Sequence, residues 1–454
     1  MLKRTLLIAS LAFAAWAAVS SGTRPAAKAP RTPAAAPPAP RRANFPDAHD
    51  APPPGWTGPV FKLSQDYPTT SPATGTQPWK AFNFKTQSVQ YLNAVLAYAL
   101  EGNVEVDFVV QNNAVRKWYH APWLHFGNNG REFIRGMTRE RSSRPKELHP
   151  NQTMMWSNWA VGFYNAPGGF VIGQVWADPN TPDPSLARFP EGTVAFKLLF
   201  TQAPVSQVPY LANDFEWLAD INRVGTTGKQ PERLRLLQID VAVRDKDANS
   251  TTGWVFGTFI YDGNTPGTTP WQRLVPIGLM FGNDPTKVLN NSPLVQTVLN
   301  PSLNIPQHLG FKKRLNGPVD NPVSSCLSCH STAQVSFDPS KPTRSGIPPA
   351  NPTNADLKLY FRNIKAGVPF DAGYASLDYS LQLQVGIANL IRAGQFQPPG
   401  PQSAVMAATP SAAARRSAAT ALTNVVPLER DGTSAAEDIP RPARPRYRGR
   451  RRHR

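Results

Sequence analysis

Two cysteines and a histidine lie within five residues of one another, in the sequence Cys326-Leu-Ser-Cys329-His330. They are the only two cysteines in a chain of 454 residues. Two thiols three residues apart, followed at once by an imidazole, form the attachment signature of c-type haem. On one helical turn the thiols can reach the two vinyl groups of the porphyrin, and the imidazole can bind the iron. The spacing therefore predicts one covalent haem c.

Two other kinds of site use cysteines at this spacing. A thioredoxin-like redox pair needs a strand–helix–strand setting, which neither the residues 322–325 before the motif nor the polar stretch after it supplies. A structural zinc site needs four ligands and usually a second cysteine pair, which this chain lacks. Covalent haem is therefore the prediction that fits the motif best.

At this motif the chain resembles the class I cytochrome c superfamily, over the motif and its immediate surroundings. The resemblance implies that Cys326 and Cys329 hold haem c and that His330 is the proximal iron ligand. It also implies a distal methionine in a downstream loop before the last helix. Here the chain departs from the family, because residues 331–405 contain neither methionine nor histidine, and Met406 lies in an Ala/Pro-rich tail.

A second, weaker similarity covers two longer stretches, Arg314–Pro322 and Gly130–Ile134. These stretches look like those of a proteobacterial group of proteins that carry a cytochrome c domain and whose role is unknown. This similarity agrees with the haem motif and implies no mechanism.

The sixth position of the iron has two possible states. It is filled by a residue from elsewhere in the chain, for which the candidates are Met280, His308, His149 and His120, or it is open to a small ligand or oxidant. Each candidate also has an ordinary structural interpretation, since a methionine such as Met280 is a common core residue. The identity of the axial ligand separates electron transfer from ligand chemistry.

The two ends of the chain differ from its middle. Residues 1–22 have a basic start, an apolar run and an A-x-A site, which predict a cleaved secretory signal peptide and a periplasmic protein, with an uncleaved N-terminal membrane anchor as the alternative. Residues 23–59 predict a Pro/Ala-rich linker, and residues 395–454 predict a disordered basic tail. The tail can contact anionic surfaces peripherally.

The net charge of +18 is concentrated at these ends. Residues 1–59 carry +5 and residues 401–454 carry +7, so the 341 residues between them carry only +6. This distribution excludes a basic nucleic-acid-binding fold for the middle of the chain.

The middle of the chain predicts an α+β, multidomain protein with disordered ends. Residues 60–283 predict a mainly antiparallel β domain of sandwich or barrel type, because short strand-like runs alternate with turns. Residues 284–394 predict a small helical domain like that of cytochrome c. Helices are expected at 85–100, 356–364 and 377–392, and strands at 104–110, 154–164, 170–176, 193–201, 237–243 and 253–261.

Two further clusters carry ionisable side chains. His120 and His125 lie among aromatic residues, and the favoured interpretation is a buried aromatic strand end with hydrogen-bonded histidines. The alternatives are a distal haem wall and a metal site formed together with His149. The basic stretch 131–146 predicts a solvated loop, with the binding of an anionic partner or a haem propionate as the alternative.

The favoured function is an exported monohaem cytochrome that transfers single electrons to a periplasmic redox partner protein. The first alternative is a haem enzyme or ligand sensor, in which peroxide, oxygen or an organic substrate reaches an open sixth position. The second alternative is a β-sandwich binding module with structural haem. The large domain is twice the size of the haem domain, which is more than simple electron transfer requires.

Overall fold

The computed structural model describes residues 45–222, 228–303, 309–338, 340–341 and 344–397. The expected signal peptide, most of the expected linker and nearly all of the expected tail lie outside these residues, as does His308. The part of the linker that is described begins at Phe45, which is buried at 6% exposure. Among the helices described, none combines the length and the apolar character needed to cross a membrane.

The centre of the fold is one antiparallel sheet of nine strands, in the order β1-β3-β4-β6-β7-β8-β9, with β2 paired to β3 and β5 paired to β6. A second sheet pairs only β10 with β11. The bounds are β1 (Trp118–Tyr119), β2 (Thr138–Arg139), β3 (Asn158–Asn165), β4 (Val194–Thr201), β5 (Glu216–Asn222), β6 (Lys229–Arg244), β7 (Trp254–Tyr261), β8 (Leu274–Met280), β9 (Thr297–Leu299), β10 (Gln334–Val335) and β11 (Ala375–Ser376). The expected antiparallel, β-rich organisation is confirmed. Within the described residues the large sheet is single rather than a sandwich of two.

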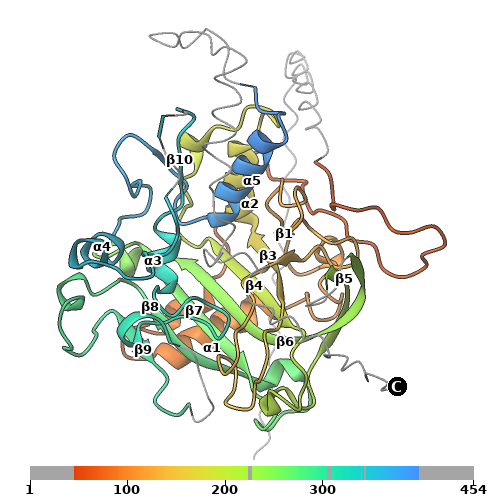
Figure 1. The fold of residues 1–454 in the computed structure, drawn as a ribbon. Coiled ribbons are helices and arrows are strands. Elements are labelled where there is room, and N and C mark those ends of the chain that lie inside the picture. Colours follow the sequence, from red (N-terminus) through yellow and green to blue (C-terminus); the bar gives the residue numbers. More distant parts are fainter. Residues whose placement is uncertain (1–44, 223–227, 304–308, 339, 342–343, 398–454) are drawn as a thin grey trace, which may run out of the picture. The chain divides into compact units, whose positions relative to one another are not determined.

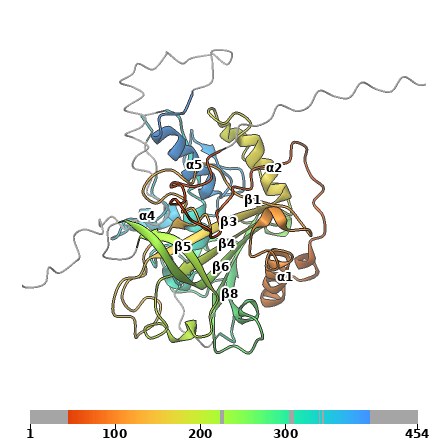
Figure 2. The same ribbon diagram turned by 90° about the vertical axis from the view of Figure 1, so that its right-hand side faces the viewer.

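Five α-helices lie around the sheet: α1 (Ser88–Leu100), α2 (Ala166–Val175), α3 (Cys326–His330), α4 (Asn354–Tyr360) and α5 (Leu381–Arg392). Figure 1 shows α5 beside α2 near the ends of the strands, and Figure 2 shows α1 and α4 on opposite sides of them. The α1 face is apolar: Gly257 of β7 has no side chain because the Leu92 side chain of α1 occupies that space. The opposite face carries polar residues.

The polar residues of that opposite face form a row across four central strands. Gly162 of β3 pairs with Lys197 of β4, Lys197 pairs with Asp240 of β6, and Asp240 pairs with Thr258 of β7. Since side chains directly opposite one another in an antiparallel sheet point to the same face, the lysine, carboxylate and hydroxyl lie side by side. The row is the floor of the site described below.

Residues on both sides of the expected boundary at 283/284 contribute to one hydrophobic core. Leu327 of α3 and Ile387 of α5 belong to the same cluster as Leu198 and Ile239 of the sheet, and each of the four is fully buried. Strand β9, from beyond that boundary, also completes the large sheet. The Cys-x-x-Cys-His motif is therefore packed directly against the β-rich part of the chain.

The strand expected at 170–176 is wrong, because this segment belongs to helix α2. The side chain of Asn165 accepts a hydrogen bond from Gly168 N (3.3 Å), and Pro167 lies in the first turn, where its missing N–H is not needed. The β-branched residues that suggested a strand are instead buried on a short helix. The sequence Asn165-Ala-Pro167 was the better signal, because it is typical of the start of a helix.

The strand expected at 104–110 is also wrong. Residues Asp107 and Phe108 adopt φ angles of 48° and 57°, which no extended strand can contain. The left-handed turn brings the carboxylate of Asp107 to the indole N–H of Trp217 at 2.9 Å, and Phe108 remains buried. The helices at 85–100, 356–364 and 377–392 and the strands at 154–164, 193–201, 237–243 and 253–261 are confirmed with shifted ends.

A buried carboxylate holds the loop between β1 and β2. Glu132 is fully buried, and its two oxygens accept hydrogen bonds from four backbone N–H groups, those of Ile134, Arg135, Met137 and Asp220. Replacement by an amide removes one acceptor oxygen and leaves two of these donors unpaired. We expect Glu132→Gln to lower the free energy of unfolding by at least about 2 kcal/mol.

Urea unfolding followed by tryptophan fluorescence measures this loss as a lower midpoint with an unchanged slope. The matched control is Glu105→Gln at an exposed position, for which we expect no change. Equal midpoints for the two variants would contradict the role assigned to Glu132.

Candidate functional site

Helix α3 presents the Cys-x-x-Cys-His motif on one buried turn. Ser325 begins the helix as a reciprocal cap: its hydroxyl accepts a hydrogen bond from Ser328 N (3.1 Å), and its own N–H donates to Ser328 Oγ (2.8 Å). The same hydroxyl donates to Asn283 Oδ1 at 3.0 Å, which ties the helix to the end of β8. Within the described residues neither Cys326 nor Cys329 forms a disulfide, and each is 9% exposed.

The imidazole of His330 is held in one orientation. Its Nδ1 lies 2.9 Å from the main-chain oxygen of Tyr379, and the ring of Phe256 lies 4.7 Å away, centre to centre. An Nδ1–H bond to a carbonyl leaves Nε2 as the nitrogen that can meet a metal. Burial lowers the pKa of His330 to about 4, although the bond to Tyr379 acts in the opposite direction. The imidazole is therefore neutral, which is the form that binds iron.

A left-handed turn supplies the carbonyl that orients this histidine. Asp378 and Tyr379 have φ angles of 47° and 70°, a conformation that is costly for residues other than glycine. The carboxylate of Asp378 stabilises the turn by accepting hydrogen bonds from Phe189 N (2.8 Å), Trp254 Nε1 (3.1 Å) and Gly367 N (3.0 Å). The turn is also the reason that α5 begins at Leu381 rather than at the expected residue 377.

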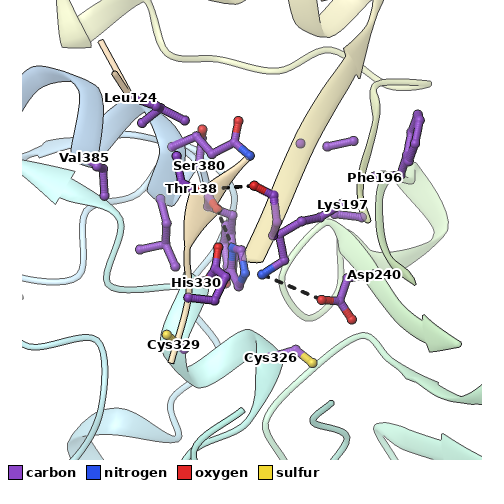
Figure 3. A pocket seen from close by; sticks show the side chains of 18 of the residues that line it. Leu124, Thr138, Phe196, Lys197, Asp240, Cys326, Cys329, His330, Ser380 and Val385 are labelled. Atoms are coloured by element: carbon purple, nitrogen blue, oxygen red, sulfur yellow. Dashed lines mark hydrogen bonds and ion pairs between the residues drawn. The ribbon is translucent and has the colours of Figure 1, made fainter. Parts of the chain in front are cut away.

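A cavity of about 370 Å³ lies between α3, α5 and the polar row of the sheet. Both thiols and the imidazole line it, and so do Lys197, Asp240 and Thr258. Figure 3 shows Lys197 and Asp240 as an ion pair on the sheet, with His330 and the two sulfurs on α3. The ion-pair distance, from Lys197 Nζ to Asp240 Oδ2, is 3.8 Å.

The remaining wall is suited to a flat, largely apolar group with charged edges. Aromatic and aliphatic side chains make up much of it, and Arg139 and Arg392 can neutralise carboxylates at its border. The volume is within the range of sites that bury a cofactor-sized molecule. The residues present therefore fit a haem attached to α3; the apolar lining residues include Leu124, Phe189, Trp254, Phe256, Leu381 and Val385.

The chemistry of the cysteines differs from that of a redox pair. Burial, together with the carboxylates of Asp320 and Asp240, raises the pKa of the Cys326 thiol well above its ordinary value. Attacking thiols of the thioredoxin type have lowered pKa values. Among the described residues no group of three or more His, Cys, Asp or Glu side chains converges to hold a metal ion. These observations support neither a thioredoxin-like redox pair nor a structural zinc site at Cys326 and Cys329.

Of the four candidates for the sixth iron ligand, Met280, His120 and His149 fall within the described residues, and none of these three lines the cavity. Met280 is fully buried opposite Phe256 in the sheet but does not line the cavity. His120 is buried between the rings of Phe61 and Phe163, and His149 lies near Tyr210; neither lines the cavity. Of the described residues that line it, only His330 is a histidine and none is a methionine.

The two other clusters have structural partners. The Nδ1 atom of His120 accepts a hydrogen bond from Ser64 N at 2.9 Å, as expected for a histidine buried among aromatic rings. In the basic stretch 131–146, Arg131 is buried and donates to two main-chain oxygens, while Arg141 pairs with Glu147. Of this stretch, Arg131 and Arg139 reach the cavity wall, as does Glu140.

Lys197, Asp240 and Glu140 were not predicted as site residues. A signal was present, because Gln238 and Asp240 occupy the polar positions of an alternating strand. That pattern alone does not say whether solvent or another segment covers the polar face.

The chain matches no protein-family model, no curated protein and no solved structure.

Proposed function

We propose that the protein is an exported c-type haem protein with one covalent haem, attached through thioethers to Cys326 and Cys329 and bound at the iron by His330. The haem supplies a one-electron centre, and single-electron transfer with a periplasmic redox partner is the favoured role. The chain itself supplies attachment, a fixed imidazole and shielding from water.

One observation supports this proposal above the others: both thiols and the imidazole of a single helical turn face the same cavity. A hydrogen bond fixes Nδ1 of His330, so the iron-binding nitrogen is defined. Such hydrogen bonds are typical partners of metal-binding histidines, because they hold the ring and raise its basicity. The burial of α3 excludes water from the ligand, and the basic tail remains a candidate contact for anionic surfaces.

The composition of the cavity wall supports a second candidate function, that of a haem enzyme or ligand sensor. Among the described residues the wall contains no methionine and no histidine other than His330. Lys197 is the nitrogen-bearing side chain of that wall best able to serve as a strong iron ligand, and it pairs with Asp240. An open sixth position favours ligand chemistry over simple electron transfer.

The test is the optical spectrum and haem content of the full chain exported to a bacterial periplasm. We expect the colour to stay with the protein through acid–acetone extraction and a haem-stained band to persist on a denaturing gel. Haem that leaves with the solvent, or a colourless protein, would overturn the proposal. Low-spin iron that ignores added ligands would favour electron transfer, and high-spin iron that binds them would favour the second candidate.

A further inference from the structure

Glu140 is a buried carboxyl group without a hydrogen-bond partner on one of its oxygens. It follows β2 and is only 7% exposed, yet within the described part of the chain Oε2 has no partner. The same side chain lines the cavity that contains His330. A buried polar atom left unpaired is uncommon and costly, and it calls for a ligand or a chemical role.

The other carboxylates of the cavity have partners. Asp240 accepts hydrogen bonds from Thr258 Oγ1 (2.9 Å) and Gln238 Nε2 (3.0 Å), and Asp320 accepts one from Gly317 N (2.6 Å). Glu140 thus differs from its neighbours in retaining unused acceptor capacity towards the cavity.

The charges around Glu140 favour a neutral molecule over an anion. Asp240 of β6 and Asp320 act on it as like charges, and Lys197 of β4 is the opposing cation. The wall also carries Arg131, Arg139, Asp378 and Arg392 and the imidazole of His330. Next to Glu140 itself, however, two carboxylates face one ammonium group.

Burial raises the pKa of Glu140 to about 7; the nearby Lys197 opposes this shift, and Asp320 and Asp240 add to it. A carboxyl group with a pKa near neutrality exchanges a proton easily at physiological pH, as a general base must. Glu140 also lines the candidate haem cavity, so a molecule that enters the cavity can exchange a proton with it.

We infer that the cavity admits a small neutral weak acid to the iron and that Glu140 accepts the proton of that acid. This inference rests on the covalent haem of the proposed function and on its second candidate role, in which the sixth position is open. The bond from hydrogen to the acid's binding atom breaks, its electron pair stays on that atom, and the proton passes to the carboxylate of Glu140. The anion so formed is the species that a ferric haem held by His330 would bind. No electron is transferred, so no oxidant or reductant is required.

Hydrogen cyanide is a suitable probe, because it is a small weak acid that is protonated at neutral pH and binds ferric iron as its anion. The association rate of cyanide, measured by stopped-flow absorbance on the exported full chain, is expected to rise with pH through about 7. The sign follows from the mechanism, since only the ionised form of Glu140 accepts the proton. For Glu140→Gln we expect a rate at least about tenfold lower at pH 8 and no pH dependence.

Two further variants keep the test independent of folding defects. Asp320→Asn removes a like charge, lowers the pKa of Glu140 and is expected to move the midpoint of the rate profile to lower pH. Glu105→Gln, at an exposed position outside the cavity, is expected to match the wild type. Urea midpoints of all variants are measured alongside.

Three results would overturn the inference. They are a pH-independent rate in the wild type, equal rates for the wild type and Glu140→Gln, or low-spin iron that binds no cyanide until Lys197→Met opens the sixth position. The absence of covalent haem would instead contradict the proposed function, and the stained gel detects that before any cyanide is added.

Discussion

The double variant Cys326→Ser, Cys329→Ser is expected to lose all covalently attached haem. Both sulfurs line the same cavity from one helical turn, and the described chain forms no disulfide with either. A serine hydroxyl cannot replace a thiol in forming the thioether. Haem staining after denaturing electrophoresis should therefore fall to background, while the wild type at equal load gives a strong band.

The single variants Cys326→Ser and Cys329→Ser test each thioether separately. Either one alone is expected to retain one thioether and a weaker band, with the reduced absorbance maximum in pyridine shifted to longer wavelength by the remaining vinyl group. Ser250→Ala, at an exposed position, serves as the control and should stain like the wild type. A stained band from the double variant would show that the haem, if covalent, is attached elsewhere.

The local features of the site were predictable from sequence. The spacing of the motif indicated one helical turn, and the structure shows that turn as α3, capped by Ser325. Central strands such as β4 and β7 followed from runs of β-branched and aromatic residues. These features depend on residues that are near one another in the chain, where propensity and capping act.

The composition of the cavity was not predictable in this way. Lys197 and Asp240 are cross-strand neighbours that come together only through the register of β4 and β6. Their face of the sheet would be solvated in an ordinary antiparallel sheet, but here the segment around α3 covers it. Which segment covers a face is a tertiary property, and alternation along one strand does not contain it.

The turn at Asp378 was missed for a related reason. The helical periodicity from Leu377 onward is real, yet the first residues of that stretch take a left-handed conformation. The hydrogen bonds that stabilise this conformation come from Phe189 and Trp254, which are distant in sequence, and from Gly367, which lies on the other side of a loop. Tertiary hydrogen bonds have overridden the local preference for helix, and the strain lies directly behind His330.

Replacing Asp378 with alanine is therefore expected to affect both stability and the site. Three N–H donors lose their acceptor, two of them buried and that of Gly367 half-buried, and we expect a loss of about 3–5 kcal/mol in the free energy of unfolding. Urea titration of the haem-loaded protein measures this loss. Asp66→Ala, at an exposed position, is the control.

The same variant tests how the imidazole is positioned. Without the carboxylate, the turn can relax towards ordinary helical geometry, and the oxygen of Tyr379 moves from Nδ1 of His330. The spectrum of the iron should then show a mixture of spin states, and the reduction potential should drift on repeated redox cycling. A core defect elsewhere, as in Glu132→Gln, should lower the free energy of unfolding and leave the spectrum unchanged. An Asp378→Ala protein with the urea midpoint and spectrum of the wild type would contradict the view that this turn fixes the proximal ligand. Because the carboxylate of Asp378 holds the turn that carries the Tyr379 carbonyl, a spectral change confined to this variant identifies Asp378 as a positioning residue.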